Sequence, residues 1–307
     1  MTTTTTTVLP SPVTSASRFA IPAALLAVYL IWGSTYLVLR WVVESLPAML
    51  AAGARYLFAG IALLAIARAR GAAWPHRSDW LRAAAPGALL FVVGNGFVSL
   101  AEREVASSQA AIVCGAMPLV TVVFGVFAGE RPKRIEIVGL LVGFAGVIAM
   151  TAFELGHATS ATALLLCAPV GWALGSILTR KLALPQGLAG AALPMVWGGV
   201  LALVVGAVMG ERWPTAPVPG KAIGAFVYLV VAGSMIAFTA YAYLLRHTRQ
   251  SVATSYAYVN PVVATLLGVV LGGETLKLHT LLGGALVVLG VGAVIVSRGR
   301  RAGSGAR

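Results

Sequence analysis

Long apolar runs, separated by short polar or proline-containing segments, dominate the chain. Each run is near the roughly 20 residues that an α-helix needs to cross a bilayer. Lipid offers no partner to a bare backbone N–H or C=O, so such a run must be helical. The pattern predicts ten spanning helices, at residues 20–39, 47–67, 81–101, 106–129, 135–153, 161–179, 188–209, 222–245, 252–272 and 278–297.

Composition supports this prediction. Of the 307 residues, 59% are apolar and 10% are charged, against about 45–50% and about 25% in soluble domains. The expected fold class is an all-α polytopic membrane protein in contact with the lipid bilayer. Residues 1–19 are expected to form a mobile cytoplasmic tail, and residues 298–307 a basic cytoplasmic tail. Cys114 and Cys167 lie within apolar runs, so we expect buried thiols and neither a disulfide nor a metal site.

The basic residues give an orientation. The net charge of +13 could indicate nucleic-acid binding, but the basic residues lie between apolar runs and form no stripe, so no nucleic-acid partner is expected. With the N-terminus in the cytoplasm, the cytoplasmic side carries sixteen basic residues: Arg18, Arg68, Arg70, Arg77, Arg82, Arg131, Lys133, Arg134, Arg180, Lys181, Arg246, Arg249, Arg298, Arg300, Arg301 and Arg307. The outer side carries five: Arg40, Arg103, Arg212, Lys221 and Lys277. This bias predicts that both termini are cytoplasmic.

Matching landmarks recur in the two halves of the chain. The block from Met117-Pro118 to Glu130 corresponds to the block from Asn260-Pro261 to Glu274, and the matched pairs also include Trp32 with Trp172, Gly139 with Gly283, and Gly146 with Gly290. The expected repeats are residues 20–153 and 161–297. Each has five spans, so the second must be inverted relative to the first. Inverted repeats build a solute site near mid-membrane that opens to each side in turn, as in carriers.

The motifs resemble the EamA family of the drug/metabolite transporter superfamily, over about residues 20–297. The resemblance rests on Ile31-Trp32-Gly33-Ser34, on Arg55-Tyr56, on the block from Pro118 to Gly129-Glu130-Arg131 and on the block from Pro261 to Gly273-Glu274. Within that family, the chain resembles bacterial exporters of amino acids of the YddG type. The resemblance implies ten helices in two inverted five-helix repeats, the bacterial inner membrane, and export of amino acids or similar small metabolites.

Eight side chains are candidates for a substrate path: Trp32, Tyr36, Arg55, Asn95, Ser99, Trp172, Ser176 and Tyr241. Aromatic rings with polar tips suit an ammonium group, and an intramembrane Arg55 suits a carboxylate, although it could instead pair with Glu102 or extend to the interface. Asn95, between two glycines, indicates either an unwound turn beside a cavity or a hydrogen bond to another helix. Tyr256, near a cytoplasmic end, is expected in the interfacial aromatic belt.

A second set of residues indicates helix packing or hinges: Pro118, Gly125, Gly129, Pro261, Gly268 and Gly272. Small residues four apart let helix backbones approach closely. A proline inside a span removes one backbone hydrogen bond and kinks the helix. Packing is favoured over hinging for the glycines, and the prolines fit either a tolerated kink or a bend around a cavity.

The acids suggest how transport is driven. None of the nine falls in the middle of a predicted span, Glu102 being the acid nearest to one, whereas proton-coupled carriers usually bury a titratable group on the path. This favours facilitated export by alternating access over proton-driven drug efflux. No Walker A motif is present, so neither ATP drive nor a cofactor is expected.

Other functions remain as alternatives. Exchange of nucleotide sugars would need several basic residues in the cavity, and only Arg55 is available. An intramembrane enzyme would need a nucleophile–base pair or metal ligands at mid-span, and a channel would need rings of selectivity residues; neither pattern is visible, so no enzyme activity is expected. The sequence leaves the solute, the direction of flux and the oligomeric state open, and a monomer is compatible with it.

Overall fold

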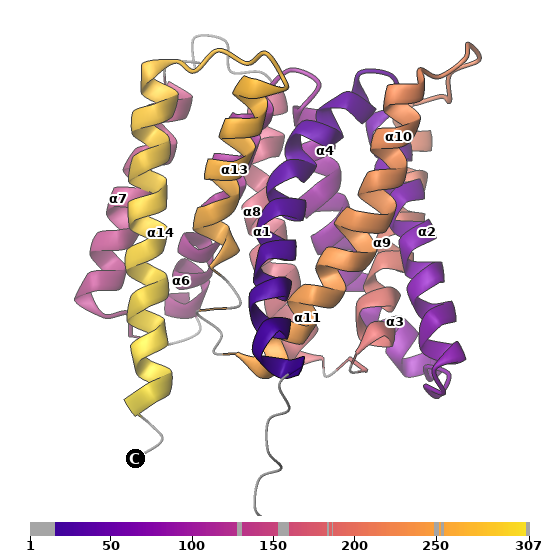
Figure 1. Cartoon of the computed structure of the whole chain (residues 1–307), viewed down its shortest axis with the longest axis horizontal. Coiled ribbons are helices and arrows are strands. Elements are labelled where there is room, and N and C mark those ends of the chain that lie inside the picture. The colour runs from indigo at the N-terminus through magenta and orange to yellow at the C-terminus, as the bar shows by residue number, and fades with distance from the viewer. Residues whose placement is uncertain are drawn as a thin grey trace, which may run out of the picture.

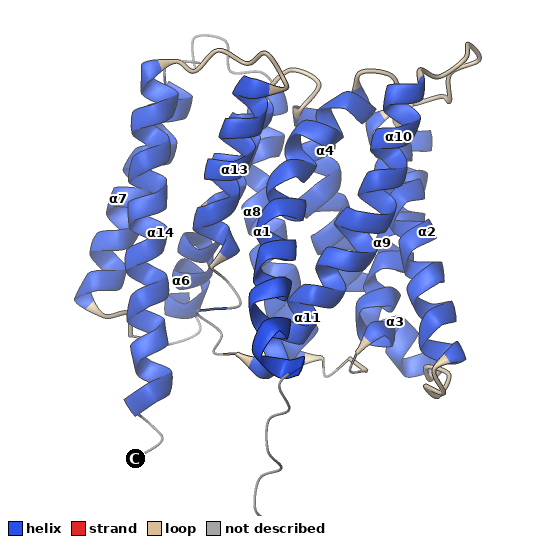
Figure 2. Ribbon diagram, viewed as in Figure 1, coloured by secondary structure: helices blue, strands red, loops and turns tan. Residues whose placement is uncertain are grey.

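The computed structural model describes residues 16–127, 131–152, 160–182, 184–185, 187–248, 252 and 255–304. Within these ranges all regular structure is helical and no strand occurs (Figure 2). Residues 1–15 and 305–307, in the predicted tails, and Gly129 lie outside the described residues.

The helices form ten rods that run up and down through the molecule (Figure 1). The first half contains α1 (Ala16–Val43), α2 (Ala48–Ala69), a third rod of α3 (Arg77–Gly87), η1 (Ala88–Gly96) and α4 (Phe97–Ala101), a fourth rod of α5 (Ser107–Gly115) and α6 (Met117–Phe127), and α7 (Arg134–Ala152). The second half contains α8 (Ser160–Lys181), α9 (Leu188–Val208), an eighth rod of α10 (Gly220–Tyr228), η3 (Leu229–Ile236) and α11 (Ala237–His247), α13 (Tyr256–Val270) and α14 (Leu278–Ser304).

The ten predicted helices are therefore present. The ends of α1 and α14 differ from the prediction, because helix extends into both predicted tails, from Ala16 and up to Ser304. The apolar runs set where a helix crosses lipid, but they do not set where its backbone hydrogen bonding ends.

Seven of the described rods are long and apolar enough to cross a membrane: Phe19–Val43, Ala48–Ala69, Arg77–Ala101, Ser107–Phe127, Ser160–Thr179, Leu188–Val208 and Gly220–Leu244. Val259–Val270 and Leu278–Val294 are shorter apolar helices. Large apolar side chains lie on the outside of the molecule, among them Phe127 and Val208, which are more than four-fifths exposed. Cys167 is also exposed, so the prediction that it is buried is wrong. An outer surface of large apolar side chains suits contact with lipid tails.

The two halves contact each other crosswise. A Cβ atom on Gly139 of α7 would lie 2.7 Å from the carbonyl oxygen of Gly290 on α14, and one on Gly146 would lie 2.5 Å from that of Gly283. Gly139 and Gly146 correspond to Gly283 and Gly290 in the repeat. Gly139 thus contacts the counterpart of Gly146, and Gly146 contacts the counterpart of Gly139. Surfaces related by a two-fold axis contact each other in this way.

The third rod of each half contains a π-helical segment, η1 or η3. The unwound turn expected around Asn95 is wrong, because the rod is continuous there. The hydrogen bond expected to another helix is also wrong: Asn95 Nδ2 donates to the carbonyl oxygen of Leu90 in its own helix, at 2.8 Å. A π-helical turn is wider than an α-helical one and is frequent at functional sites.

The two matched prolines differ in their surroundings. The fourth rod is interrupted by a turn at Ala116, two residues before Pro118, whereas α13 continues as a helix through Pro261. Pro261 packs against Gly115, where an added Cβ would lie 2.8 Å from the Pro261 Cγ atom. Pro261 therefore lies where α13 crosses α5.

The predicted glycines that the structure describes have different neighbours. Gly125 is half-buried on α6. A Cβ on Gly272 would lie 2.8 Å from Leu37 Cδ1, so Gly272 packs against α1. A Cβ on Gly268 would lie 2.5 Å from Glu274 Oε2, so this glycine leaves room for a carboxylate.

Candidate functional site

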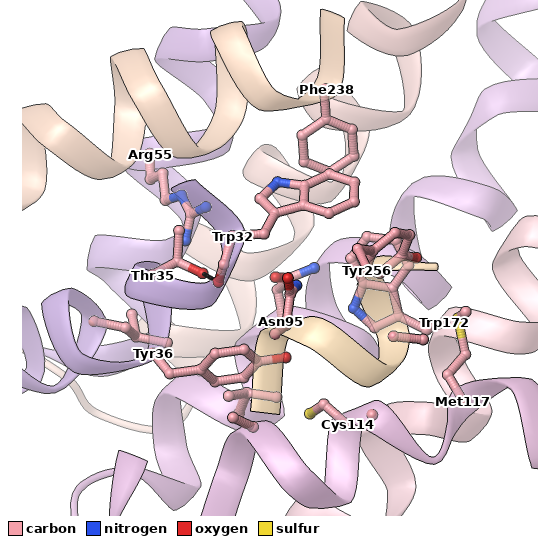
Figure 3. Close-up of a pocket in the computed structure, with 16 residues that line it drawn as sticks. Trp32, Thr35, Tyr36, Arg55, Asn95, Cys114, Met117, Trp172, Phe238 and Tyr256 are labelled. Carbon is pink, nitrogen blue, oxygen red and sulfur yellow. Dashed lines mark hydrogen bonds between the residues drawn. The ribbon is translucent and has the colours of Figure 1, made fainter. Parts of the chain in front are cut away.

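A small cavity of about 80 Å³ lies where helices of the two halves meet (Figure 3). Described residues from nine elements line it: α1, α2, η1, α4, α5, α6, α8, α11 and α13. Five of the eight predicted substrate residues lie in this cavity: Trp32, Tyr36, Arg55, Asn95 and Trp172.

The other three predicted residues lie nearby. Ser99 is buried and donates a hydrogen bond to the carbonyl oxygen of Asn95, at 3.0 Å, so it supports the cavity wall. Ser176 and Tyr241 line a second cavity, of about 330 Å³. Trp172 and Phe238 line both cavities and stand between them.

Aromatic side chains form this partition. The ring centroid of Trp32 lies 5.1 Å from that of Phe238 and 4.8 Å from that of Tyr256, both edge to face. Trp172 stacks on Phe238 at 6.2 Å. Aromatic pairs of this kind contribute about 0.5–1.5 kcal/mol each beyond their burial. The partition is thus a packed element that must rearrange before a solute can pass.

Each tryptophan packs against a glycine in the π-helical segment of the opposite half. Trp32 Nε1 donates to the carbonyl oxygen of Gly233 in η3, at 3.1 Å. A Cβ on Gly94 in η1 would lie 2.7 Å from Trp172 Cδ1. The matched residues Trp32 and Trp172 therefore have matched surroundings, and the π-helical segments position them.

Arg55 is the one cation among the described residues that line the cavity. Its side chain is 6% exposed, and its Nε donates to Ser234 Oγ on η3, at 2.8 Å. The alternatives of an ion pair with Glu102 and of an extension to the interface are both wrong, because Glu102 accepts no hydrogen bond within the described chain and Arg55 is buried inside the bundle. Arg55 thus remains available to a carboxylate in the cavity.

Sequence reasoning missed several polar residues of the cavity, among them Thr35, Tyr256 and Asn260. Tyr256, expected in the aromatic belt, instead packs on Trp32 and lines the cavity, because α13 begins beside α1 and turns its first residues inward. Asn260 is 6% exposed, and within the described chain its side-chain oxygen has no hydrogen-bond partner. The repeat could have revealed Asn260, because its counterpart Met117 also lines the cavity.

Glu274 connects the second half to the start of α5. Its Oε1 accepts hydrogen bonds from the backbone N–H and the hydroxyl of Ser107, at 2.8 and 2.6 Å. Its Oε2 accepts one from the backbone N–H of Ser108, at 3.2 Å, and Arg40 Nη1 lies 3.3 Å from Oε1. Burial raises the pKa of Glu274, but the hydrogen bonds from Ser107 and Ser108 outweigh burial, so the net pKa is lowered. Glu274, which is a matched residue of the repeat, therefore holds the segment after α13 against the start of α5.

We expect Glu274→Gln to destabilise the protein by about 2 kcal/mol, because hydrogen bonds to a charged group contribute about 1.5–3 kcal/mol. The matched control is Glu44→Gln, since Glu44 also pairs with Arg40, at 3.6 Å, but is 53% exposed; we expect almost no effect there. Because the folded-state pKa is lowered, this contribution is present at neutral pH and is lost as the pH falls through that pKa. Thermal midpoints in detergent measure both variants, and equal midpoints at pH 7 would contradict the assignment.

No group of three or more His, Cys, Asp or Glu side chains that could hold a metal occurs in the part of the chain that the structure describes. The site offers a cation, an amide oxygen and aromatic rings, which are groups for binding a solute.

An all-helical molecule with an apolar outer surface, duplicated halves and between them a small cavity that contains a few polar side chains has the architecture of a membrane transporter. The chain belongs to the EamA-like transporter family, whose model matches it twice, over residues 19–152 and 159–296. It is 41% identical to the uncharacterized inner membrane transporter YedA of Escherichia coli K12, over 90% of each chain.

More distant relatives are also transporters. The chain is 28% identical to a probable terminal-alkyne amino-acid exporter of Streptantibioticus cattleyicolor, over 87% of this chain and 91% of that protein. It is 24% identical to the uncharacterized transporter YvbV of Bacillus subtilis, over 87% and 90%. One solved crystal structure has the same fold, with a TM-score of 0.65 and 22% identity, over 93% of this chain and all of that one.

Proposed function

We propose that this protein is an inner-membrane carrier that exports amino acids or similar small metabolites by alternating access, facilitated rather than driven by ATP. In this proposal ten helices span the membrane as two inverted five-helix repeats, with both termini in the cytoplasm. The observation that carries it is the cavity between the halves, where Arg55 and Asn260 lie among aromatic rings, the Asn260 oxygen having no hydrogen-bond partner among the described residues.

These groups complement a zwitterion. A guanidinium binds a carboxylate through charge-assisted hydrogen bonds. The side-chain oxygen of Asn260 accepts hydrogen bonds, as an ammonium group requires. The faces of Trp32 and Tyr256 add cation–π attraction for the same ammonium. One cation is too few for a nucleotide diphosphate, so the cavity favours amino acids over nucleotide sugars.

The size of the cavity indicates a nearly closed state. Its volume of about 80 Å³ is well below the roughly 300–1,000 Å³ of ordinary ligand pockets. Only a very small solute fits without movement of the aromatic partition. Since Trp32 and Trp172 have matched surroundings in opposite halves, opening towards one side and opening towards the other can use equivalent motions, which supports alternating access.

Counterflow of labelled amino acids into proteoliposomes tests the function. We expect exchange of at least one small neutral amino acid, with little exchange of cationic drugs or nucleotide sugars. If drugs or nucleotide sugars exchange and no amino acid does, the proposed substrate class is wrong. The relative named as an amino-acid exporter supports the choice of panel.

Asn260→Leu should lower amino-acid exchange about tenfold, because one hydrogen bond to a charged group contributes about 1.5 kcal/mol or more. Thr265→Val on the same helix is the matched control, since Thr265 lines an apolar groove outside the cavity. The rate of counterflow at limiting solute concentration is the measurement. Equal losses in the two variants would show that Asn260 has no specific part in binding.

A further inference from the structure

Glu102 is a buried acid that the proposed binding site does not use. It follows Ala101, the last residue of α4, at the upper end of the molecule in Figure 1. Its side chain is 2% exposed. The apolar residues Leu39, Val98 and Val105 belong to the core at this end. Glu102 is therefore sealed from water in the form of the protein described here.

Neither carboxyl oxygen of Glu102 has a hydrogen-bond partner among the described residues. Two partly buried carboxylates at this end, Glu274 and Glu211, differ in this respect. Both oxygens of Glu274 accept hydrogen bonds, and so do both oxygens of Glu211, which accept them from the backbone N–H groups of Met49 and Leu50. A carboxylate without donors is costly to bury, so the neutral acid is the favoured form of Glu102.

Charged side chains shift the pKa of Glu102 although none of the described ones forms a hydrogen bond with it. Burial raises the pKa of Glu102 well above its ordinary value, and the negative charge of Glu274 raises it further. Arg40 and Arg55 lower it, although by less. Arg40 is already held by Glu274 and Arg55 by Ser234. The two cations thus lie near enough to act on Glu102 but are engaged elsewhere.

Glu102 in turn acts electrostatically on two further titratable groups, Tyr36 on α1 and Cys114 on α5. Both line the cavity, as does Arg55. Glu102 therefore interacts electrostatically both with groups of the cavity and with the Arg40–Glu274 ion pair. Any motion that opens this end must change how water reaches its carboxyl group.

We propose that Glu102 is a proton-binding site that controls the transport cycle: the closed form holds a proton on its carboxyl group, and opening of this end releases it to water. One O–H bond forms on closure and breaks on opening, and the proton enters and leaves at the same face. The solute flux remains facilitated, but its rate is set by pH. This proposal rests on the proposed function and concerns the acid that the sequence placed nearest to a span, which the structure shows to be buried.

The first test is stability, which needs no solute. Because the pKa of Glu102 is raised in the folded form, the folded chain binds more protons than the unfolded chain between the ordinary and the raised pKa. Its contribution to stability is therefore greatest at low pH and falls as the pH rises across that interval. Glu102→Gln, a neutral isostere, should remove this part of the dependence, whereas the exposed Glu104→Gln should not.

The second test is counterflow of a neutral amino acid at equal pH on both sides, from pH 5.5 to 8.5, where its own charge does not change. We expect the wild-type rate to rise with pH by up to about tenfold per unit, the limit for one proton. Glu102→Gln should exchange slowly and without pH dependence, and Glu104→Gln should match the wild type.

Identical pH profiles of wild type and Glu102→Gln, in thermal midpoint and in counterflow, would overturn the proposal. If the wild type exchanges no amino acid, the proposed function fails instead, and the thermal midpoints still decide whether Glu102 carries the proton.

Discussion

Replacement of Arg55 by Gln is expected to lower amino-acid exchange about 10- to 100-fold. Arg55 is the one cation among the described residues of the cavity, and charge-assisted hydrogen bonds contribute about 1.5–3 kcal/mol. Glutamine keeps a donor and much of the length but loses the charge and the two-pronged geometry. The loss should therefore appear as a weaker interaction with the solute carboxylate, measured by counterflow at limiting concentration.

Two comparisons make this result specific. Arg103→Gln removes an exposed cation from the same end of the molecule and should leave exchange unchanged. With an amino-acid amide, which lacks the carboxylate, wild type and Arg55→Gln should bind about equally. If Arg55→Gln lowers competition by the amide as much as by the acid, Arg55 acts on the structure of the cavity and does not bind a carboxylate.

Gly290→Val is expected to destabilise the protein by about 3 kcal/mol or more, near the upper end of the usual cost of overpacking. A Cβ on Gly290 would lie 2.6 Å from the backbone N of Gly143 and would also meet the carbonyl oxygen of Gly139. These are backbone atoms of α7, so no side chain can move aside, and the two helices must separate. The measurement is the thermal midpoint in detergent, with size-exclusion chromatography to detect loss of the folded form.

Gly292→Val on the same helix is the matched control, because a Cβ there would meet nothing within 4 Å. Both variants lose one helical glycine and gain the same β-branched side chain, so propensity cancels between them. A thermal midpoint for Gly290→Val equal to that of Gly292→Val would show that the crosswise glycine contact does not hold α7 against α14.

The helices were predictable to within a few residues, since bilayer thickness fixes the length of an apolar run and lipid leaves the helix as the structure for each run. Polar and aromatic residues inside such runs are few, and this scarcity identified Arg55, Trp32 and Trp172 as candidates. The positions of the π-helical segments were not predictable, because hydropathy says nothing about hydrogen-bond register within a helix.

Some residues were misjudged for a shared reason. Tyr256 and Glu102 lie at the ends of apolar runs, where distance along the sequence indicates the interface with water. In the folded chain Tyr256 packs on Trp32 of another helix, and Glu102 is buried at the end of α4, where its chain neighbours Ala101 and Val105 belong to a core cluster with Leu39 of α1. Depth in a membrane protein depends on which helices surround a residue as well as on its place in its own helix.

The sequence by itself determined the all-helical class, the duplication and the family motifs, because these follow from the local order of apolar, small and basic residues. Only the tertiary structure decided which of the candidate side chains share one cavity, that Arg55 is held by Ser234 rather than by Glu102, and that Asn260 and Glu102 lack partners within the described chain. The physical reason is that hydrogen bonding and burial are properties of contacts between helices far apart in the chain, and hydrophobic patterning specifies the face that each helix buries but not the atom that it meets.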